Sequence, residues 1–343
     1  MKAKQVEYVL DSCEYVCELS PRDIKINLHP LGGNALPHTC ITRSSRAVRQ
    51  QAESRHPASL FGYRVYGSLD SRGNESGGVY VVHDLETHEV HTLKHVIRGA
   101  DDIRMRRLIH EHSLGKYCGH SCLRSGGKLL RFRNTIRVSE LGLLVPFIDG
   151  DRFDHWKPTS VCAFIDACVD ISDGLRHMHS SDWIHGDVSA RHIMVDDHGA
   201  AILIGGGGSV HAGEKRAPIE GPHETLRAPE VVRGESRTAR TDIFGLGAAM
   251  YGQLVGPGLV QLSVRLANAE DLDLEFWHTR VKENLRKYCS VRSMRALVAA
   301  CLDPNPRGRP LNAEVVGREL RSMRGVAAVR FDGRSVDDLA IAA

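Results

Sequence analysis

Short apolar runs of alternating pattern dominate the chain between residues 61 and 148. β-Branched and aromatic side chains recur in these runs and turn-forming residues separate them, which is typical of half-buried strands. A charged segment at 103–118 interrupts the runs and is predicted to be a helix. We therefore expect one helix among five strands, which the pattern places at 63–67, 78–82, 90–96, 129–138 and 141–148.

After residue 151 the pattern becomes helical. Val161, Phe164, Cys168, Ile171 and Leu175 follow one another at steps of three and four, which is the stripe of a helix that faces a core. Further helices are predicted at about 240–255, 290–302 and 311–323. Strands and helices are thus segregated along the chain, and this predicts an α+β fold of two lobes with a cleft between them.

The two ends of the chain differ from this central part. Residues 1–58 are polar and rich in turn formers, and are predicted to be a largely irregular tail with one short helix near 6–16. Residues 326–343 are predicted to be a C-terminal tail. The domain between them is expected at 59–325, with a first lobe at 59–148 and a second at 149–325.

Composition narrows the class of protein. The 343 residues carry a formal net charge of +3 with acids and bases interspersed, which argues against a protein that coats nucleic acid. The nine cysteines show no regular framework, and neither a secretory start nor an apolar run of membrane-spanning length is present. We expect an intracellular protein of the cytoplasm or nucleus, with neither nucleic acid nor membrane as a partner.

Five histidines and cysteines, residue types that often bind metals, lie within the predicted first-lobe helix or just after it. Their spacing matches no zinc-finger pattern, so ordinary packing of these side chains is favoured over a zinc site. The group comprises His110, His112, Cys118, His120 and Cys122.

The segment from His185 to Val195 carries the main chemical signal. It resembles the catalytic loop of protein kinases, whose pattern is H-R-D-L-x-x-x-N. Further landmarks of that family follow in order: Ala-Pro-Glu ending at Glu230, an Asp-Ile-Phe-Gly segment from Asp242, and a C-terminal arginine, Arg309. In the first lobe a lysine lies fifteen residues after Val79, and the resemblance covers about 61–325.

The resemblance implies a bilobal kinase fold with a small antiparallel-sheet lobe, and a nucleotide site for ATP. Asp187 would be the catalytic proton acceptor, and Lys94, which would contact the α- and β-phosphates, would be held by an ion pair with Glu111. The glycine-rich loop and the adenine pocket would involve Gly77, Val79, Val145, Pro146 and Ile148.

The family's metal ligands are absent from their positions in this chain. Counting from Asp187, the asparagine position holds His192 and the aspartate of D-F-G falls on Gly205. Mg²⁺ prefers oxygen ligands, so neither residue suits it and no metal ligand is assigned. The phosphate loop keeps only its last glycine, and Gly186 replaces the arginine that would contact a phosphorylated activation segment.

Three functions remain open on this sequence. The first is a pseudokinase that regulates or scaffolds a protein partner and retains ATP binding. The second is a divergent active kinase that phosphorylates a serine, threonine or tyrosine of a protein substrate. The third is a kinase-like enzyme acting on a small molecule. The Arg, His and Gly content also resembles that of kinase-like proteins of large DNA viruses, and the sequence does not specify an oligomeric state.

Overall fold

The computed structural model describes the chain in segments, and all structural statements refer to these. Only the backbone is described for residues 5–10, 13–18, 29–30, 102, 133–139 and 327–330. No described helix is both long and apolar enough to cross a membrane. The described segments are 5–10, 13–18, 29–30, 59–69, 77–97, 102–124, 126–134, 137–212, 226–256 and 274–330.

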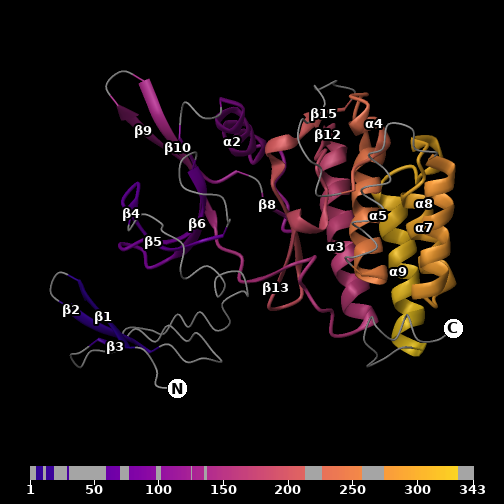
Figure 1. Ribbon diagram of the computed structural model, residues 1–343, viewed down its shortest axis with the longest axis horizontal. Coiled ribbons are helices and arrows are strands. Elements are labelled where there is room, and N and C mark those ends of the chain that lie inside the picture. The colour runs from indigo at the N-terminus through magenta and orange to yellow at the C-terminus, as the bar shows by residue number, and fades with distance from the viewer. Residues whose placement is uncertain are drawn as a thin grey trace.

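A six-stranded antiparallel sheet forms the first lobe (Figure 1). Its strands follow the order β4-β5-β6-β7-β10-β9, so the central strand β7 lies between β6 and β10. The five predicted strands are confirmed, although the hairpin boundary expected near 139–140 is wrong. The strands are β4 (Ser59–Leu60), β5 (Tyr63–Ser68), β6 (Gly77–His83), β7 (Val90–Ile97), β9 (Lys128–Asn134) and β10 (Arg137–Pro146).

The misplaced boundary has a structural reason. Arg137 already pairs with Asn134, and the register shifts between Val138 and Glu140. Such a bulge lets a strand continue past an irregular position, and side-chain alternation alone does not reveal it.

Helix α2 (Asp102–Leu114) packs against the sheet. Met105 and Leu108 of the helix are buried in one cluster with Leu141 and Leu143 of β10. The helix ends four residues before the predicted end at Cys118, whose N–H still bonds to the carbonyl of Leu114 across a turn. This packing fixes the helix beside β7 and so positions its side chains at the site.

The second lobe is helical, as the apolar stripe predicted. All five stripe residues named above are buried in α3 (Val161–Ser180), whose cap Ser160 accepts a hydrogen bond from the N–H of Ala163. Four longer helices follow α3 along the chain: α5 (Ala239–Val255), α7 (Leu274–Tyr288), α8 (Arg292–Cys301) and α9 (Ala313–Arg330). Of these, α7 was not predicted from the sequence.

Short strands, 3₁₀ helices and one short α-helix complete the described structure. One small sheet has the order β11-β13-β14-β8, and β12 pairs with β15. The elements are β8 (Leu123–Arg124), β11 (Gly150–Arg152), β12 (Trp183–Ile184), η2 (Ala190–His192), β13 (Ile193–Asp196), β14 (Ala201–Ile204), η3 (Gly206–Gly208), β15 (Val210–His211), α4 (Pro229–Val232) and η4 (Pro306–Gly308).

The helix expected near 6–16 is wrong. That segment forms two antiparallel strands, β1 (Gln5–Leu10) and β2 (Cys13–Glu18), and β2 also pairs with β3 (His29–Pro30). Valine and tyrosine are frequent in both strands, and these residues favour extended backbone. The division into tails and lobes stays a prediction, and α9 continues past residue 326 to Arg330.

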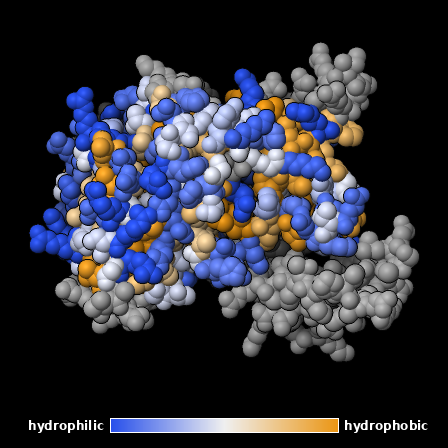
Figure 2. Space-filling model, turned by 180° about the vertical axis from the view of Figure 1, so that it is seen from behind, coloured by the Kyte–Doolittle hydropathy of each residue, from blue (hydrophilic) through white to orange (hydrophobic). Residues whose placement is uncertain are grey.

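Figure 2 shows the molecule from behind. Over the helical lobe the surface is mainly hydrophilic, with small apolar areas between the polar ones.

Candidate active site

Lys94 and Glu111 meet although they come from different elements. The Lys94 Nζ lies 2.5 Å from the Glu111 Oε1, with the lysine on β7 and the glutamate on α2. The Glu111 side chain is only 6% exposed and that of Lys94 20%. The strand neighbours of Lys94 are Val79 on β6 and Leu143 on β10.

The remaining predicted nucleotide residues lie on β6 and β10 or directly after β10. Val79 and Val145 lie on β6 and β10, the two strands that flank β7. Pro146 ends β10 and Ile148 follows it, where the chain leaves the first lobe. Gly77 pairs with Val96 and has a φ of +104°, a backbone that suits glycine. The predicted phosphate loop runs from 72 to 79, and its residues 72–76 lie outside the described residues.

The backbone of the catalytic loop is held by a buried aspartate of α5. The Asp242 carboxylate accepts hydrogen bonds from the N–H groups of His185 and Gly186 at 2.8 and 2.7 Å. Its Oδ2 also lies 2.8 Å from the His179 ring. Because Asp242 is 1% exposed, its charge is balanced by these donors rather than by water.

The ring of His185 is buried between the loop and β14. Its Nε2 lies 3.1 Å from the carbonyl of Ile204, and its Nδ1 lies 3.4 Å from the N–H of Asp187. A carbonyl can only accept, so the proton is on Nε2 and Nδ1 is the acceptor. Burial lowers the pKa of His185, although the nearby Asp242 carboxylate opposes the shift.

His192 lies over Asp187. Its Nδ1 is 2.7 Å from the carbonyl oxygen of Asp187 and 3.6 Å from its Oδ2. The Nδ1 must therefore donate to the carbonyl, which leaves the Nε2 of a neutral ring as an acceptor. The Asp187 side chain is 28% exposed, so its carboxylate remains accessible.

The second lost metal position faces the same ring. Gly205 has a left-handed backbone with a φ of +85°, and a Cβ placed there would lie 3.0 Å from the Cδ2 of His192. An imidazole thus occupies the space in which the two oxygen ligands are expected by resemblance. Among the described residues, no group of three or more His, Cys, Asp or Glu side chains could hold a metal ion. These residues do not fit Mg²⁺.

The glycine run contacts the first-lobe helix closely. A Cβ at Gly207 would lie 3.0 Å from the carbonyl oxygen of Arg107, and the His110 Nε2 is 2.8 Å from the Ser209 Oγ. Side chains at 207 would push α2 away, so this glycine allows the helix to approach. In the predicted His/Cys group, His110 therefore packs as a hydrogen-bonding side chain and Cys118 is buried.

Two arginines near Asp187 were not singled out from the sequence. A Cβ at Gly186 would lie 2.7 Å from a guanidinium nitrogen of Arg237, which is 3% exposed and donates to the carbonyl of Gly208 at 3.2 Å. Arg227, whose pKa is lowered by burial, lies within electrostatic range of Asp187. Position 186 holds a glycine where the family has an arginine, and Arg237, in the loop before α5, places its guanidinium beside this glycine.

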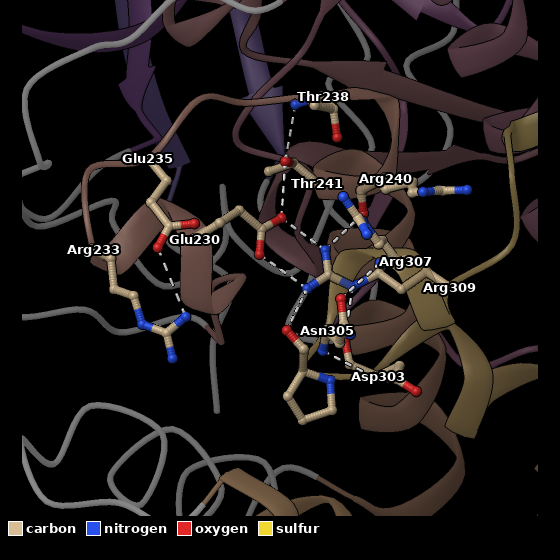
Figure 3. Close-up of polar contacts among 11 residues, drawn as sticks. Glu230, Arg233, Glu235, Thr238, Arg240, Thr241, Asp303, Asn305, Arg307 and Arg309 are labelled. Atoms are coloured by element: carbon tan, nitrogen blue, oxygen red, sulfur yellow. Dashed lines mark hydrogen bonds and ion pairs between the residues drawn. The ribbon is translucent and has the colours of Figure 1, made fainter.

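A buried ion pair joins Arg309 and Glu230 in the second lobe (Figure 3). The two terminal nitrogens of the Arg309 guanidinium donate to Glu230, at 2.7 and 2.9 Å, and the Thr241 hydroxyl donates to the same carboxylate at 2.9 Å. Arg309 also donates to the carbonyl of Asp303. The ion pair thus joins the Ala-Pro-Glu motif to the C-terminal arginine.

A comparison of the sequence with known families agrees with this arrangement. The family model described as the protein kinase domain matches residues 72–320. The chain belongs to the protein kinase family. The bilobal fold, the paired Lys94 and Glu111, and the loop around Asp187 are thus parts of a kinase domain.

Several characterised kinases are similar to this kinase domain at low identity. The serine/threonine-protein kinase PknK of Mycobacterium tuberculosis is 27% identical over 175 residues, 50% of this chain and 15% of that protein. G protein-coupled receptor kinase 1 of Caenorhabditis elegans is 28% identical over 154 residues, 44% of this chain and 23% of that protein. The serine/threonine-protein kinase pakB of Dictyostelium discoideum is 24% identical over 203 residues, 56% of this chain and 22% of that protein. The chain thus spans less than a quarter of each of these relatives.

Proposed function

We propose that this kinase domain is a pseudokinase that regulates or scaffolds a protein partner and binds ATP without depending on Mg²⁺. The contact between the His192 ring and Gly205 carries the proposal. Phosphoryl transfer depends on positioning and on neutralisation of charge, much of which the metal ions supply in this family. The ring fills that space and offers a nitrogen where oxygen ligands would be needed.

ATP binding is supported by what remains of the site. Lys94 is held by Glu111 and is accessible over a fifth of its side chain, so its ammonium is available to phosphate oxygens. Val79 and Val145 flank the lysine strand and offer apolar contacts to an adenine ring. The proposal therefore separates binding of the nucleotide from its turnover.

A divergent active kinase is the second candidate, and one observation favours it. The Asp187 carboxylate remains accessible beside the His192 ring. The lysine pair and a proton acceptor are both present, so transfer to a serine, threonine or tyrosine hydroxyl of a protein would lack only its usual cations. A cation such as Arg227, which lies within electrostatic range of Asp187, would then have to replace a metal.

A reduced, intracellular setting in the cytoplasm or nucleus is part of the proposal. The six cysteines whose side chains are described are all free, and three of them, Cys168, Cys289 and Cys301, are fully buried. Burial raises the pKa of the Cys301 thiol to about 12, which makes it unreactive at neutral pH.

The test measures nucleotide binding and transfer separately. Thermal unfolding of the full chain is followed with ATP, ATP plus Mg²⁺ and ATP plus Mn²⁺, and transfer of labelled γ-phosphate to a mixed serine, threonine and tyrosine peptide library is measured in parallel. Lys94→Met is the binding variant, Asp187→Ala the catalytic one, and Asp197→Ala the matched control on an exposed turn.

We expect a shift with ATP that is independent of metal and is lost in Lys94→Met, with no transfer above background. Transfer that requires Mg²⁺ or Mn²⁺ and disappears in Asp187→Ala but not in Asp197→Ala would refute the pseudokinase and establish the second candidate. The absence of any shift with ATP would refute nucleotide binding.

A further inference from the structure

A cavity of about 700 Å³ lies between α7 and α8, on the helical lobe and away from Lys94 and Asp187. We call it the basic groove, and its charged lining consists of Lys282 and Arg286 from α7, Arg292 and Arg295 from α8, and Asp303. Leu285 of α7 and three alanines of α8, Ala296, Ala299 and Ala300, contribute apolar surface. The volume is within the range of sites that bind a specific ligand.

The groove has a large excess of positive charge. Four cations line it against one carboxylate, whereas the whole chain is nearly balanced at +3. The Asp303 carboxylate already accepts a hydrogen bond from the Asn305 N–H at 2.8 Å. Lys282, Arg286 and Arg292 are exposed, and within the described part of the chain they form no ion pair. Such a concentration of one charge in a concavity attracts ligands of the opposite charge.

Part of the groove is rigidly built. The Arg295 guanidinium donates to the carbonyls of Cys289 and Ser290 at 2.8 and 3.3 Å, which fixes its position at the end of α7. The buried His278 ring is fixed by its contact with the carbonyl of Ala299 at 2.8 Å. Burial lowers the pKa of His278, so at neutral pH the base of the groove is uncharged and the charge lies on the rim.

We propose that the basic groove binds an acidic peptide segment of a protein partner, with apolar side chains on its floor and carboxylates on its cationic rim. An apolar floor surrounded by charge suits a peptide, in which apolar and acidic residues alternate at short range. A nucleic-acid backbone would instead require positive charge spread over a longer surface. The proposal rests on the proposed function as a binding module and names the chemistry of its partner.

The groove also adjoins the buried ion pair of the second lobe. Asp303 lines the groove, and its backbone carbonyl accepts from the Arg309 Nε at 2.7 Å (Figure 3). Arg309 in turn binds Glu230 just after the Ala-Pro segment. A peptide in the groove would therefore contact the same short loop whose Asp303 carbonyl holds Arg309.

The test uses the full chain without nucleotide or metal and a fluorescein-labelled ten-residue peptide of alternating glutamate and leucine. Fluorescence anisotropy gives its Kd for the native protein and for Arg286→Glu, Arg292→Glu and the control Lys287→Glu. Lys287 follows Arg286 on the same helix, is exposed and does not line the groove, so its substitution changes net charge equally. A lysine and leucine peptide of equal length is the second control.

We expect Arg286→Glu and Arg292→Glu each to weaken binding about tenfold, which corresponds to about 1.4 kcal/mol, and Lys287→Glu to leave it within about twofold. Equal weakening by Lys287→Glu would show attraction by net charge alone and overturn the proposal, as would binding of the lysine peptide or no effect of either groove variant. The binding measurement contains no nucleotide, so phosphotransfer detected in the separate transfer assay would refute the pseudokinase without affecting this result.

Discussion

The imidazole of His192 lies against the backbone of Gly205, so that a side chain at 205 would meet it at 3.0 Å. In this chain the two positions at which the family binds its metals are therefore in contact with each other. The His192 ring occupies the space that Gly205 leaves open because glycine has no side chain. This relationship predicts that restoring one metal position alone is unfavourable.

Gly205→Asp should destabilise the fold, and His192→Asn should relieve part of the loss. The positive φ at 205 costs about 1 kcal/mol for a residue with a Cβ, and the contact with the ring adds to this cost. A double-mutant cycle measured by urea unfolding should therefore give a coupling free energy of about 1 kcal/mol.

Gly199→Asp is the matched control for that cycle. Gly199 has nearly the same φ, +87°, but an added Cβ would meet nothing within 4 Å. It should show the backbone cost and no coupling to His192→Asn. Equal coupling at both glycines would contradict the contact between the ring and position 205.

Breaking the Lys94–Glu111 pair from one side should be costly. Lys94→Met leaves the Glu111 carboxylate 6% exposed without its cation, for which we expect a loss of about 3 kcal/mol in the free energy of unfolding. The double variant Lys94→Met/Glu111→Leu removes the stranded charge and should recover at least half of the loss in urea unfolding. A double variant that is less stable than Lys94→Met would contradict this account of the pair.

A buried arginine–carboxylate pair should contribute more to the free energy of unfolding than an exposed pair of similar chemistry. Arg309→Ala leaves the buried Glu230 unpaired, and we expect a loss of about 4 kcal/mol. Arg321→Ala removes a contact with Asp173 that is 48% exposed on the arginine side, and we expect about 0.5 kcal/mol. Thermal and urea unfolding of both variants check the comparison, and equal losses would show that burial of Glu230 is not the deciding factor.

Stability should fall as the pH is lowered from 7 to 5.5. Burial lowers the pKa of His185 from 6.5, so in this range the unfolded chain binds a proton that the folded protein does not. His278 and His83 shift in the same direction. Asp149 and Asp170, whose pKa values are raised by burial, act in the opposite direction near their own pKa values, so the range stays above pH 5.5.

His185→Asn should reduce the slope of unfolding free energy against pH by up to about 1.4 kcal/mol per pH unit. The ring of His198 is 86% exposed, and His198→Asn is the control that should leave the slope unchanged. Urea unfolding at several pH values measures both slopes. An unchanged slope in His185→Asn would show that this ring takes up its proton equally in both states.

Much of the candidate site followed from the resemblance to kinase motifs. The resemblance assigned Lys94, Glu111 and Asp187 to their motif positions, and counting from Asp187 located His192 and Gly205. The apolar stripe from Val161 predicted the central helix of the second lobe. These features could be predicted because motif order and apolar periodicity are properties of the sequence itself.

Only the tertiary structure decided which distant side chains meet. The ring of His192 could point in several directions until packing placed it over Gly205. Arg237 reaches the space beside Gly186 from fifty-one positions further along the chain, and no local pattern indicates this approach. The basic groove likewise exists only because α7 and α8 pack side by side. A sequence specifies which groups are available, but their directions and partners follow from the packing of elements that are far apart in the chain.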